Sequence, residues 1–352
     1  MLISSKRFLK LGAGLLVAIV CFVAALWGIP LADVRHSFAR ANYLTLPLML
    51  LGLFAFFWLK AVRWRLLLEP VRRFETREVV SPMMIGFMGN NILPAHLGEF
   101  MRIYVLGREH GLSKTAVFSS VVLERVFDVI AILFLFAVSL VFVDGLPESY
   151  KSSSLAIAGV TLVGLLVLGA YVVWTDFFVR IAEKLLRFVP DSLRGKLIGM
   201  LETGAEGLHS LRSPRLAVGI IATSLAQWAI NGLTAYCAVL SFGQTLPLLA
   251  SFFVIFVIAI GVTVPSTPGF FGVIQLCFWF GVQPFGVDKA DAFAASVYYH
   301  LSQYIPVTLV GLYCLSRSGL KLTQVQGGAI ETESIENEAV ETKAVETTQT
   351  VG

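Results

Sequence analysis

Five ionisable side chains lie within or beside apolar sequence between residues 90 and 128. An ionised group at the centre of a membrane helix costs about 2.5–3.5 kcal/mol unless it finds a partner or water. Two of the five are arginines, whose planar guanidinium can bind a phosphate through two parallel hydrogen bonds. The other three are acids, which could hold a cationic headgroup or carry a coupling proton. The five residues are Glu99, Arg102, Glu124, Arg125 and Asp128.

Two interpretations of these charges stay open at the level of sequence. In the first, they form a substrate-binding site for a lipid headgroup, with Arg125 and Glu124 as its strongest members. In the second, the acids pair with the arginines and lock a short hairpin against the long helix that follows it. Glu124 and Asp128 are four residues apart and share a helix face, so both interpretations predict that these charges come together.

Four uncharged polar residues complete the candidate substrate-binding set. Asn90 and His96 fall in a helix-breaking stretch, while Gln275 and His300 lie in apolar sequence near the carboxyl end. The neutral imidazole of His96 or His300 could relay protons. Each could equally be a hydrogen-bonded packing residue of a membrane helix.

The composition places these residues in a membrane protein. Of the 352 residues, 57% are hydrophobic and 14% charged, whereas soluble domains are about 45–50% apolar. Several apolar runs reach the roughly 20 residues that cross a hydrocarbon core. The runs are continuous rather than alternating, so they predict helices and not barrel strands. A net charge of +4 gives no support to nucleic-acid binding, and no motif for a metal or cofactor is present.

We expect an all-α polytopic membrane protein with six spans and two re-entrant or broken-helix hairpins. The spans and hairpins form one domain over residues 1–320. An amphipathic connection over 176–215 and an acidic, disordered tail over 321–352 are expected on the cytoplasmic side. The expected spans are about 11–29, 43–60, 115–143, 154–174, 216–240 and 292–316, and the hairpins about 79–108 and 246–284.

Basic residues set the expected orientation. The densest basic cluster follows the second span, and the positive-inside rule assigns such clusters to the cytoplasm. Both termini are then cytoplasmic, in the cell's inner membrane. The cluster comprises Lys60, Arg63, Arg65, Arg72, Arg73 and Arg77.

Matching spacings in the two halves predict an inverted repeat. In each hairpin a proline precedes a glycine by four residues, and in each half a glycine precedes a polar residue of the next span by 14 residues. Inverted repeats with broken helices are typical of secondary transporters, with a site near the membrane midplane. Shared ancestry without transport is the alternative. The matched pairs are Pro94 and Gly98 with Pro265 and Gly269, and Gly111 and Arg125 with Gly286 and His300.

Three motifs combine helix breaks with polar residues. They are NNILPAHLGEFMR at 90–102, LERVFD at 123–128 and PSTPGFFG at 265–272. Together they resemble the flippase-like family named for the transmembrane region of lysylphosphatidylglycerol synthases. The resemblance covers about residues 8–318. It implies translocation of modified phospholipids between leaflets, or association with enzymes of lipid-linked sugar metabolism. The aminoacyl-transferase domain of the synthases is absent from this sequence, so synthesis of a lysyl lipid is not expected.

Two positions depart from the family pattern, in which a glutamate often replaces Gln275 and an arginine often replaces His300. Both changes remove or soften a charge. If the family pair is an ion pair, a hydrogen bond between Gln275 and His300 would replace it without charge. It is therefore open whether this chain has the site that other family members have in the second repeat.

Three functions follow from the sequence. The first is movement of an anionic or zwitterionic lipid, or of a lipid-linked phosphate, between leaflets of the cytoplasmic membrane. The second is a transferase acting on a lipid phosphate, although no phosphate-binding glycine-lysine loop, metal triad or serine elbow is found. The third is a non-catalytic subunit of an envelope lipid or glycan enzyme. The expected partners are a membrane lipid, a second copy of the chain or such an enzyme.

Overall fold

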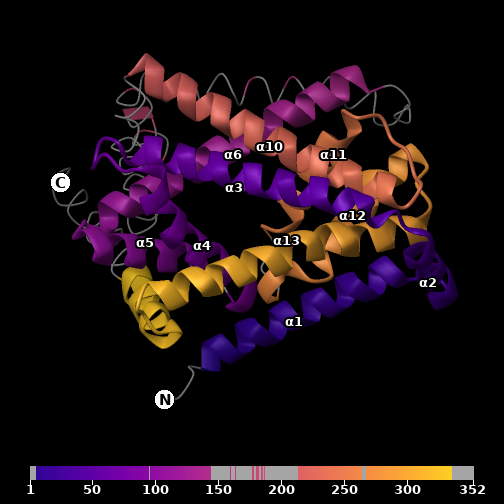
Figure 1. The fold of residues 1–352 in the computed structure, drawn as a ribbon, viewed down its shortest axis with the longest axis horizontal. Coiled ribbons are helices and arrows are strands. Elements are labelled where there is room, and N and C mark those ends of the chain that lie inside the picture. The colour runs from indigo at the N-terminus through magenta and orange to yellow at the C-terminus, as the bar shows by residue number, and fades with distance from the viewer. Residues whose placement is uncertain are drawn as a thin grey trace.

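The computed structural model describes residues 5–94, 96–143, 213–263 and 267–334, and seven isolated residues between 159 and 186. All regular structure in these ranges is helical, as the sequence predicted, and the long helices run along the long axis of the molecule (Figure 1). Most of the expected span 154–174 and most of the connection 176–215 lie outside the described residues.

The helices follow the predicted order of spans and hairpins. The segments expected to form hairpins each contain two helices, α4 with α5 and α11 with α12. Residues 93–96 separate the first two helices, and residues 262–272, which include the short helix η4, separate the second two. The elements are α1 (Ser5–Leu26), α2 (Leu31–Arg40), η1 (Tyr43–Thr45), α3 (Leu46–Leu68), α4 (Thr76–Ile92), α5 (Leu97–His110), α6 (Lys114–Phe142), α10 (Pro214–Ser241), α11 (Ala250–Gly261), η4 (Pro268–Phe270), α12 (Val273–Val282), η5 (Gln283–Phe285) and α13 (Lys289–Arg317).

Three described helical segments are long and apolar enough to cross a membrane. They are Tyr43–Leu68, Lys114–Phe142 and Pro214–Ser241. A fourth results if α1 and α2, which meet at an angle of 79°, are counted as one bent span. Helix α13 is also long, at 29 residues, but is richer in polar residues. These helices coincide with the expected spans at 43–60, 115–143, 216–240 and 292–316.

Glycines let the two helices of each hairpin approach closely. A Cβ added at Gly98 of α5 would lie 1.9 Å from the carbonyl oxygen of Gly86 in α4. A Cβ added at Gly281 of α12 would lie 2.9 Å from the Cα of Val254 in α11. Small residues at membrane helix interfaces allow such backbone contacts, which supply van der Waals attraction where no water is available to drive association.

The breaks between the hairpin helices face one another. The ring of His96, which precedes α5, lies 5.4 Å from the ring of Phe270, which precedes α12. These are the two non-glycine residues with positive φ in the described part of the chain, at 54° and 60°. Asn91 of α4 also donates a hydrogen bond of 2.9 Å to the hydroxyl of Thr308 in α13. The two halves therefore meet at their irregular segments.

The start of the carboxyl-terminal tail differs from the sequence prediction. Residues 322–334 are helical rather than disordered. Val325 and Ala329 are fully buried there, and Gly328 lies against the ring of Tyr104 in α5. The apolar side of this segment gains enough contact with α5 to order it despite its acidic composition. Residues 335–352 lie outside the described part.

We predict that Gly98→Ala destabilises the protein by about 1–3 kcal/mol or more, because its Cβ would overlap the carbonyl oxygen of Gly86. The measurement is thermal unfolding in detergent, followed by loss of the monodisperse chromatographic peak. Gly12→Ala in α1 is the matched control, since a Cβ there meets nothing within 4 Å. Equal stability of the two variants would contradict the close packing of α4 and α5.

Candidate functional site

Five charged side chains are buried together where α3, α5 and α6 meet. None is more than 4% exposed. We call this group the charge cluster. Since a buried charge without a partner is strongly destabilising, its members must satisfy one another or bind something that does. They are Lys60, Arg63, Arg102, Glu124 and Asp128.

Two cations of α3 face the two carboxylates of α6. Nζ of Lys60 lies 2.7 Å from Oε1 of Glu124 and 3.1 Å from Oδ2 of Asp128. Nη2 of Arg63 lies 2.8 Å from Oδ1 of Asp128. The cations are three residues apart and the acids four, so each pair occupies one helix face. Helical periodicity thus sets a row of cations against a row of acids.

The third cation comes from the first hairpin. Nη1 of Arg102 in α5 donates a hydrogen bond of 2.7 Å to Oε2 of Glu124. Its guanidinium also lies 5.1 Å from the centre of the Trp64 ring, within the range of a cation–π contact. The indole nitrogen of Trp64 donates in turn to Ser120 of α6 at 3.0 Å. Arg102 therefore ties the hairpin to both α3 and α6.

Helix α10 closes the fourth side of the charge cluster. Asp128 accepts hydrogen bonds of 2.7 Å from the side-chain amide of Gln227 and from the indole of Trp228. Nη1 of Arg63 donates to the hydroxyl of Ser224 at 3.0 Å. Asp128 is thus held by groups from α3 and α10, which explains how a carboxylate persists in this apolar surrounding.

The remaining charges form a separate, more exposed pair beside the charge cluster. Nη2 of Arg125 lies 2.6 Å from Oε1 of Glu99, and the side chains are 42% and 26% exposed. Nη1 of Arg125 is 3.9 Å from Oδ2 of Asp128, which links the pair to the buried charges. Both the ion-pair interpretation and the headgroup interpretation are compatible with this position.

The charge cluster holds more positive than negative charge. It has three cations against two carboxylates, and the adjoining pair of Arg125 and Glu99 adds none. Nε and Nη2 of Arg102 and Nε of Arg63 are buried without a hydrogen-bond partner. An unpaired buried donor costs about 1–3 kcal/mol, and more when it is charged. The arrangement is therefore suited to accept one further anionic group.

Sequence reasoning missed two members of the charge cluster. Lys60 and Arg63 were assigned with their neighbours to the cytoplasmic end of a span, whereas both side chains are completely buried against α6. Their spacing was the available signal, because residues three apart share a helix face, as Glu124 and Asp128 do at a spacing of four. Gln227, which was not among the predicted site residues, belongs to the same site.

Two predicted site residues lie at the first helix break rather than in the charge cluster. Oδ1 of Asn90 is buried without a hydrogen-bond partner, beside Gly98. His96 is the residue before α5, in the left-handed conformation, with its ring near Phe270. His96 thus lies in the break, where the sequence predicted a turn, whereas Asn90 belongs to helix α4, in a stretch that the sequence predicted to break the helix.

Gln275 and His300 form the neutral pair that the sequence suggested. Nε2 of Gln275 lies 3.1 Å from Nδ1 of His300, and Oε1 of Gln275 accepts a hydrogen bond of 2.7 Å from the backbone N–H of Gly272. The amide thus donates to the imidazole and caps the start of α12. His300 also lies against the ring of Phe271, with centroids 4.5 Å apart. This pair is formed by α12 and α13, and so is distinct from the charge cluster.

Comparison with known proteins places the chain among membrane proteins. The profile of the family described as "Lysylphosphatidylglycerol synthase TM region" matches residues 11–311. The UPF0104 membrane protein MJ1078 of Methanocaldococcus jannaschii is 27% identical over 238 residues, which are 66% of this chain and 96% of that protein. Glycosyltransferase AglD of Haloferax volcanii is 27% identical over 286 residues, which are 72% of this chain but 45% of that protein.

We predict that Glu124→Gln destabilises the protein by about 3–5 kcal/mol, because it leaves Lys60 and Arg102 without their shared carboxylate. Glu99→Gln is the matched control and is expected to cost about 1 kcal/mol or less, since its pair with Arg125 is partly exposed. Thermal unfolding in detergent measures both. Similar losses for the two variants would show that burial does not distinguish these carboxylates.

Proposed function

Because the chain belongs to the family of the lysylphosphatidylglycerol synthase TM region, as its motifs predicted, we propose that it moves a phosphate-bearing lipid between the leaflets of the membrane. The charge cluster is the headgroup site of this proposal. Its buried excess of positive charge is the observation that supports it, together with the guanidinium nitrogens that lack partners.

A phosphodiester supplies what the charge cluster lacks. Its single negative charge, added to the two carboxylates, balances the three cations. Its oxygens can accept from Arg102 and Arg63, whose free Nε–H groups have no other acceptor. Hydrogen bonds between guanidinium and phosphate are charge-assisted and about twice as strong as neutral ones. The site therefore favours an anionic phosphate over a neutral or cationic group.

The ion pair of Arg125 and Glu99 lies at the exposed edge of this site. It is partly exposed, and exposed pairs contribute only about 0–1 kcal/mol. Exchanging Glu99 for a lipid phosphate at Arg125 therefore costs little. Since Arg125 also reaches within 3.9 Å of Asp128, it can pass the phosphate from the exposed position to the buried cations. Arg125 is thus the first contact and Arg102 the inner one.

An inverted repeat supplies the conformational change in this proposal. Arg125 and His300 are each the twelfth residue of a 29-residue helix, counted from Lys114 of α6 and Lys289 of α13. Arg125 contacts Glu99, which is the third residue of α5, and His300 contacts Gln275, which is the third residue of α12. Both α5 and α12 are the helices that follow a break. Equivalent positions make equivalent contacts, which supports two related four-helix units, α3–α6 and α10–α13.

The breaks of the two units would then be the pivot. α5 and α12 both begin at the central contact between His96 and Phe270, so their amino-terminal dipole ends approach the same region. Transporters with paired broken helices expose a central site by rocking one repeat against the other. In this mechanism α4 and α5 act as one re-entrant hairpin and α11 and α12 as the other.

The orientation follows from the basic loops. Both termini face the cytoplasm of a cell with an inner membrane, as the positive-inside rule indicates. Lys60 lies eight residues before the end of α3, about 12 Å, and 14 residues after its start, about 21 Å. The charge cluster therefore lies nearer to the cytoplasmic leaflet than to the outer one in this orientation.

A second candidate function is a membrane subunit of a glycan or lipid biosynthetic enzyme. The similarity to a protein named as a glycosyltransferase favours it, although the matched part is less than half of that protein. In that case a lipid-linked phosphate would be bound by the same cations and presented to a partner. Binding without transfer between leaflets distinguishes this function from transport.

We predict that Arg125→Ala abolishes transfer while leaving the protein folded, because it removes the first phosphate contact and only a partly exposed ion pair. The measurement is leaflet transfer of fluorescent phospholipids and polyprenyl phosphate in proteoliposomes. Arg73→Ala is the matched control, since its side chain is 87% exposed. Normal transfer by Arg125→Ala would refute the site, and no transfer by the wild type would favour the subunit function.

We predict opposite accessibility for the two ends of the molecule. With the native cysteines replaced, a cysteine at Gly286 should react with a membrane-impermeant maleimide added outside intact cells. A cysteine at Arg73 should react only after the membrane is opened. Neither position makes a close packing contact with neighbouring helices. Labelling in the reverse pattern would show that the termini are outside.

A further inference from the structure

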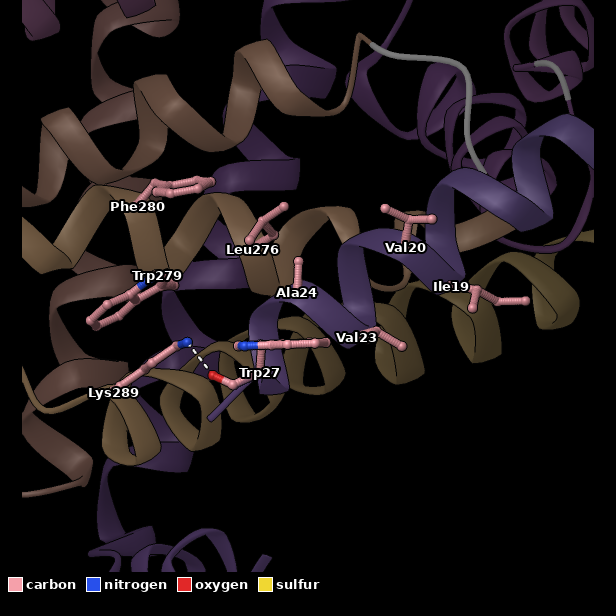
Figure 2. A pocket seen from close by; sticks show the side chains of 9 residues that line it. All are labelled: Ile19, Val20, Val23, Ala24, Trp27, Leu276, Trp279, Phe280 and Lys289. Carbon is pink, nitrogen blue, oxygen red and sulfur yellow. Dashed lines mark hydrogen bonds between the residues drawn. The ribbon is translucent and has the colours of Figure 1, made fainter. Parts of the chain in front are cut away.

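A groove lies between α1 and α12 (Figure 2). In the ribbon view α1 lies on the opposite side of the molecule from α10 (Figure 1). The volume of the groove is about 580 Å³. Val20 and Ala24 of α1 line one wall, and Leu276 and Phe280 of α12 line the other. Val20 and Phe280 are 57% and 51% exposed, so the groove is open to the surroundings of the protein.

A cation closes one end of the groove. Nζ of Lys289 donates a hydrogen bond of 2.5 Å to the backbone carbonyl of Trp27 and lies 5.7 Å from the centre of the Trp279 ring (Figure 2). An ammonium group has three N–H donors, so two remain for a ligand. Tryptophans and lysines of membrane proteins gather at the level of the lipid headgroups.

A polar pocket of about 330 Å³ continues from the groove and shares Lys289 with it. Two acids and two cations line it, but one of the cations also pairs with a third acid outside the lining, so negative charge is in excess. Arg40 forms an ion pair with the buried carboxylate of Asp291 and is held in place. Asp288 accepts hydrogen bonds from two backbone N–H groups at the start of α13. The four lining charges are Asp33, Arg40, Asp288 and Lys289.

We propose that the groove and the polar pocket together bind one zwitterionic phospholipid, with an acyl chain between α1 and α12 and the phosphate at Lys289. The amine of the headgroup faces Asp33 and Asp288. This is a resident lipid site, separate from the charge cluster, and its occupation does not depend on transport.

The dimensions of the groove fit an acyl chain of one leaflet. From Ile19 to Trp27 it follows α1 for eight residues, about 12 Å, and one leaflet contributes about 15 Å of the hydrocarbon core. A chain lying there has its ester end at the tryptophans and its phosphate at Lys289. An apolar protein helix in the same place would leave Lys289, Asp33 and Asp288 of the polar pocket without a partner.

The charges of the polar pocket determine the headgroup. Phosphatidylglycerol would satisfy Lys289 with its phosphate, but its neutral glycerol would leave Asp33 and Asp288 without a cation. A primary amine can donate to both carboxylates, while its phosphate accepts from the lysine. Phosphatidylethanolamine chemistry therefore fits better than phosphatidylglycerol, and diacylglycerol, which lacks the phosphate, is expected to bind weakly.

The test is native mass spectrometry of the full chain released from nanodiscs that contain equal amounts of phosphatidylethanolamine, phosphatidylglycerol and diacylglycerol. The wild type is expected to retain one phosphatidylethanolamine. Lys289→Gln should lower that retention about tenfold, the loss expected for one charge-assisted hydrogen bond. Ala24→Phe, which fills the groove without altering the polar pocket, should lower it similarly.

Lys321→Gln is the control, because this exposed lysine lies beyond the opposite end of α13. Unchanged retention in Lys289→Gln or in Ala24→Phe would overturn the site. Stronger retention of phosphatidylglycerol, or equal retention of diacylglycerol, would overturn the headgroup assignment. Since the charge cluster is also proposed to bind a lipid phosphate, the lipid assigned to the groove is the one lost in Lys289→Gln and Ala24→Phe but retained in the charge cluster variant Arg125→Ala.

Discussion

Burial of ionised side chains at the junction of α3, α5, α6 and α10 is the constraint on which the rest of the fold depends. Asp128 is bound by Lys60 and Arg63 of one helix and by Gln227 and Trp228 of another. Removing any partner of such a network leaves a charge without compensation, which is far more costly than losing an apolar contact. The ion pairs therefore fix how each helix is rotated about its axis and how far it is shifted along its neighbours. The lipid-facing surfaces, which are apolar, impose no such constraint.

Close backbone packing provides the second constraint. The hairpin of α4 and α5 brings Arg102 to the charge cluster, and it can do so because Gly86 and Gly98 let the two helices touch. The hairpin of α11 and α12 is built in the same way, but it presents Gln275 to His300 and contains no buried ion pair at that position. The two halves thus share geometry and differ in charge, so the proposed headgroup site belongs to the first half alone.

Much of the fold could be predicted from the sequence. Long apolar runs predicted the positions of α3, α6, α10 and α13, and prolines and glycines predicted the positions of both breaks. Both predictions are possible because local composition controls where a helix can form. The hydrogen bond between Gln275 and His300 was also anticipated. The burial of Lys60 and Arg63 was not predicted, because a basic residue near a helix end usually reaches water. Only the packing of the facing helix in the structure shows that these two side chains do not reach water.

The sequence by itself determined the class of the protein, the positions of its helices and the set of polar residues in its apolar segments. These properties follow from free energies that depend on one segment at a time, such as the free energy of transferring its side chains into the membrane. Only the tertiary structure decided which charges are buried, which partners they have, and that cations exceed acids in the charge cluster. Those properties depend on contacts between residues as distant in sequence as Lys60, Asp128 and Gln227, and electrostatic energy depends on distance in space.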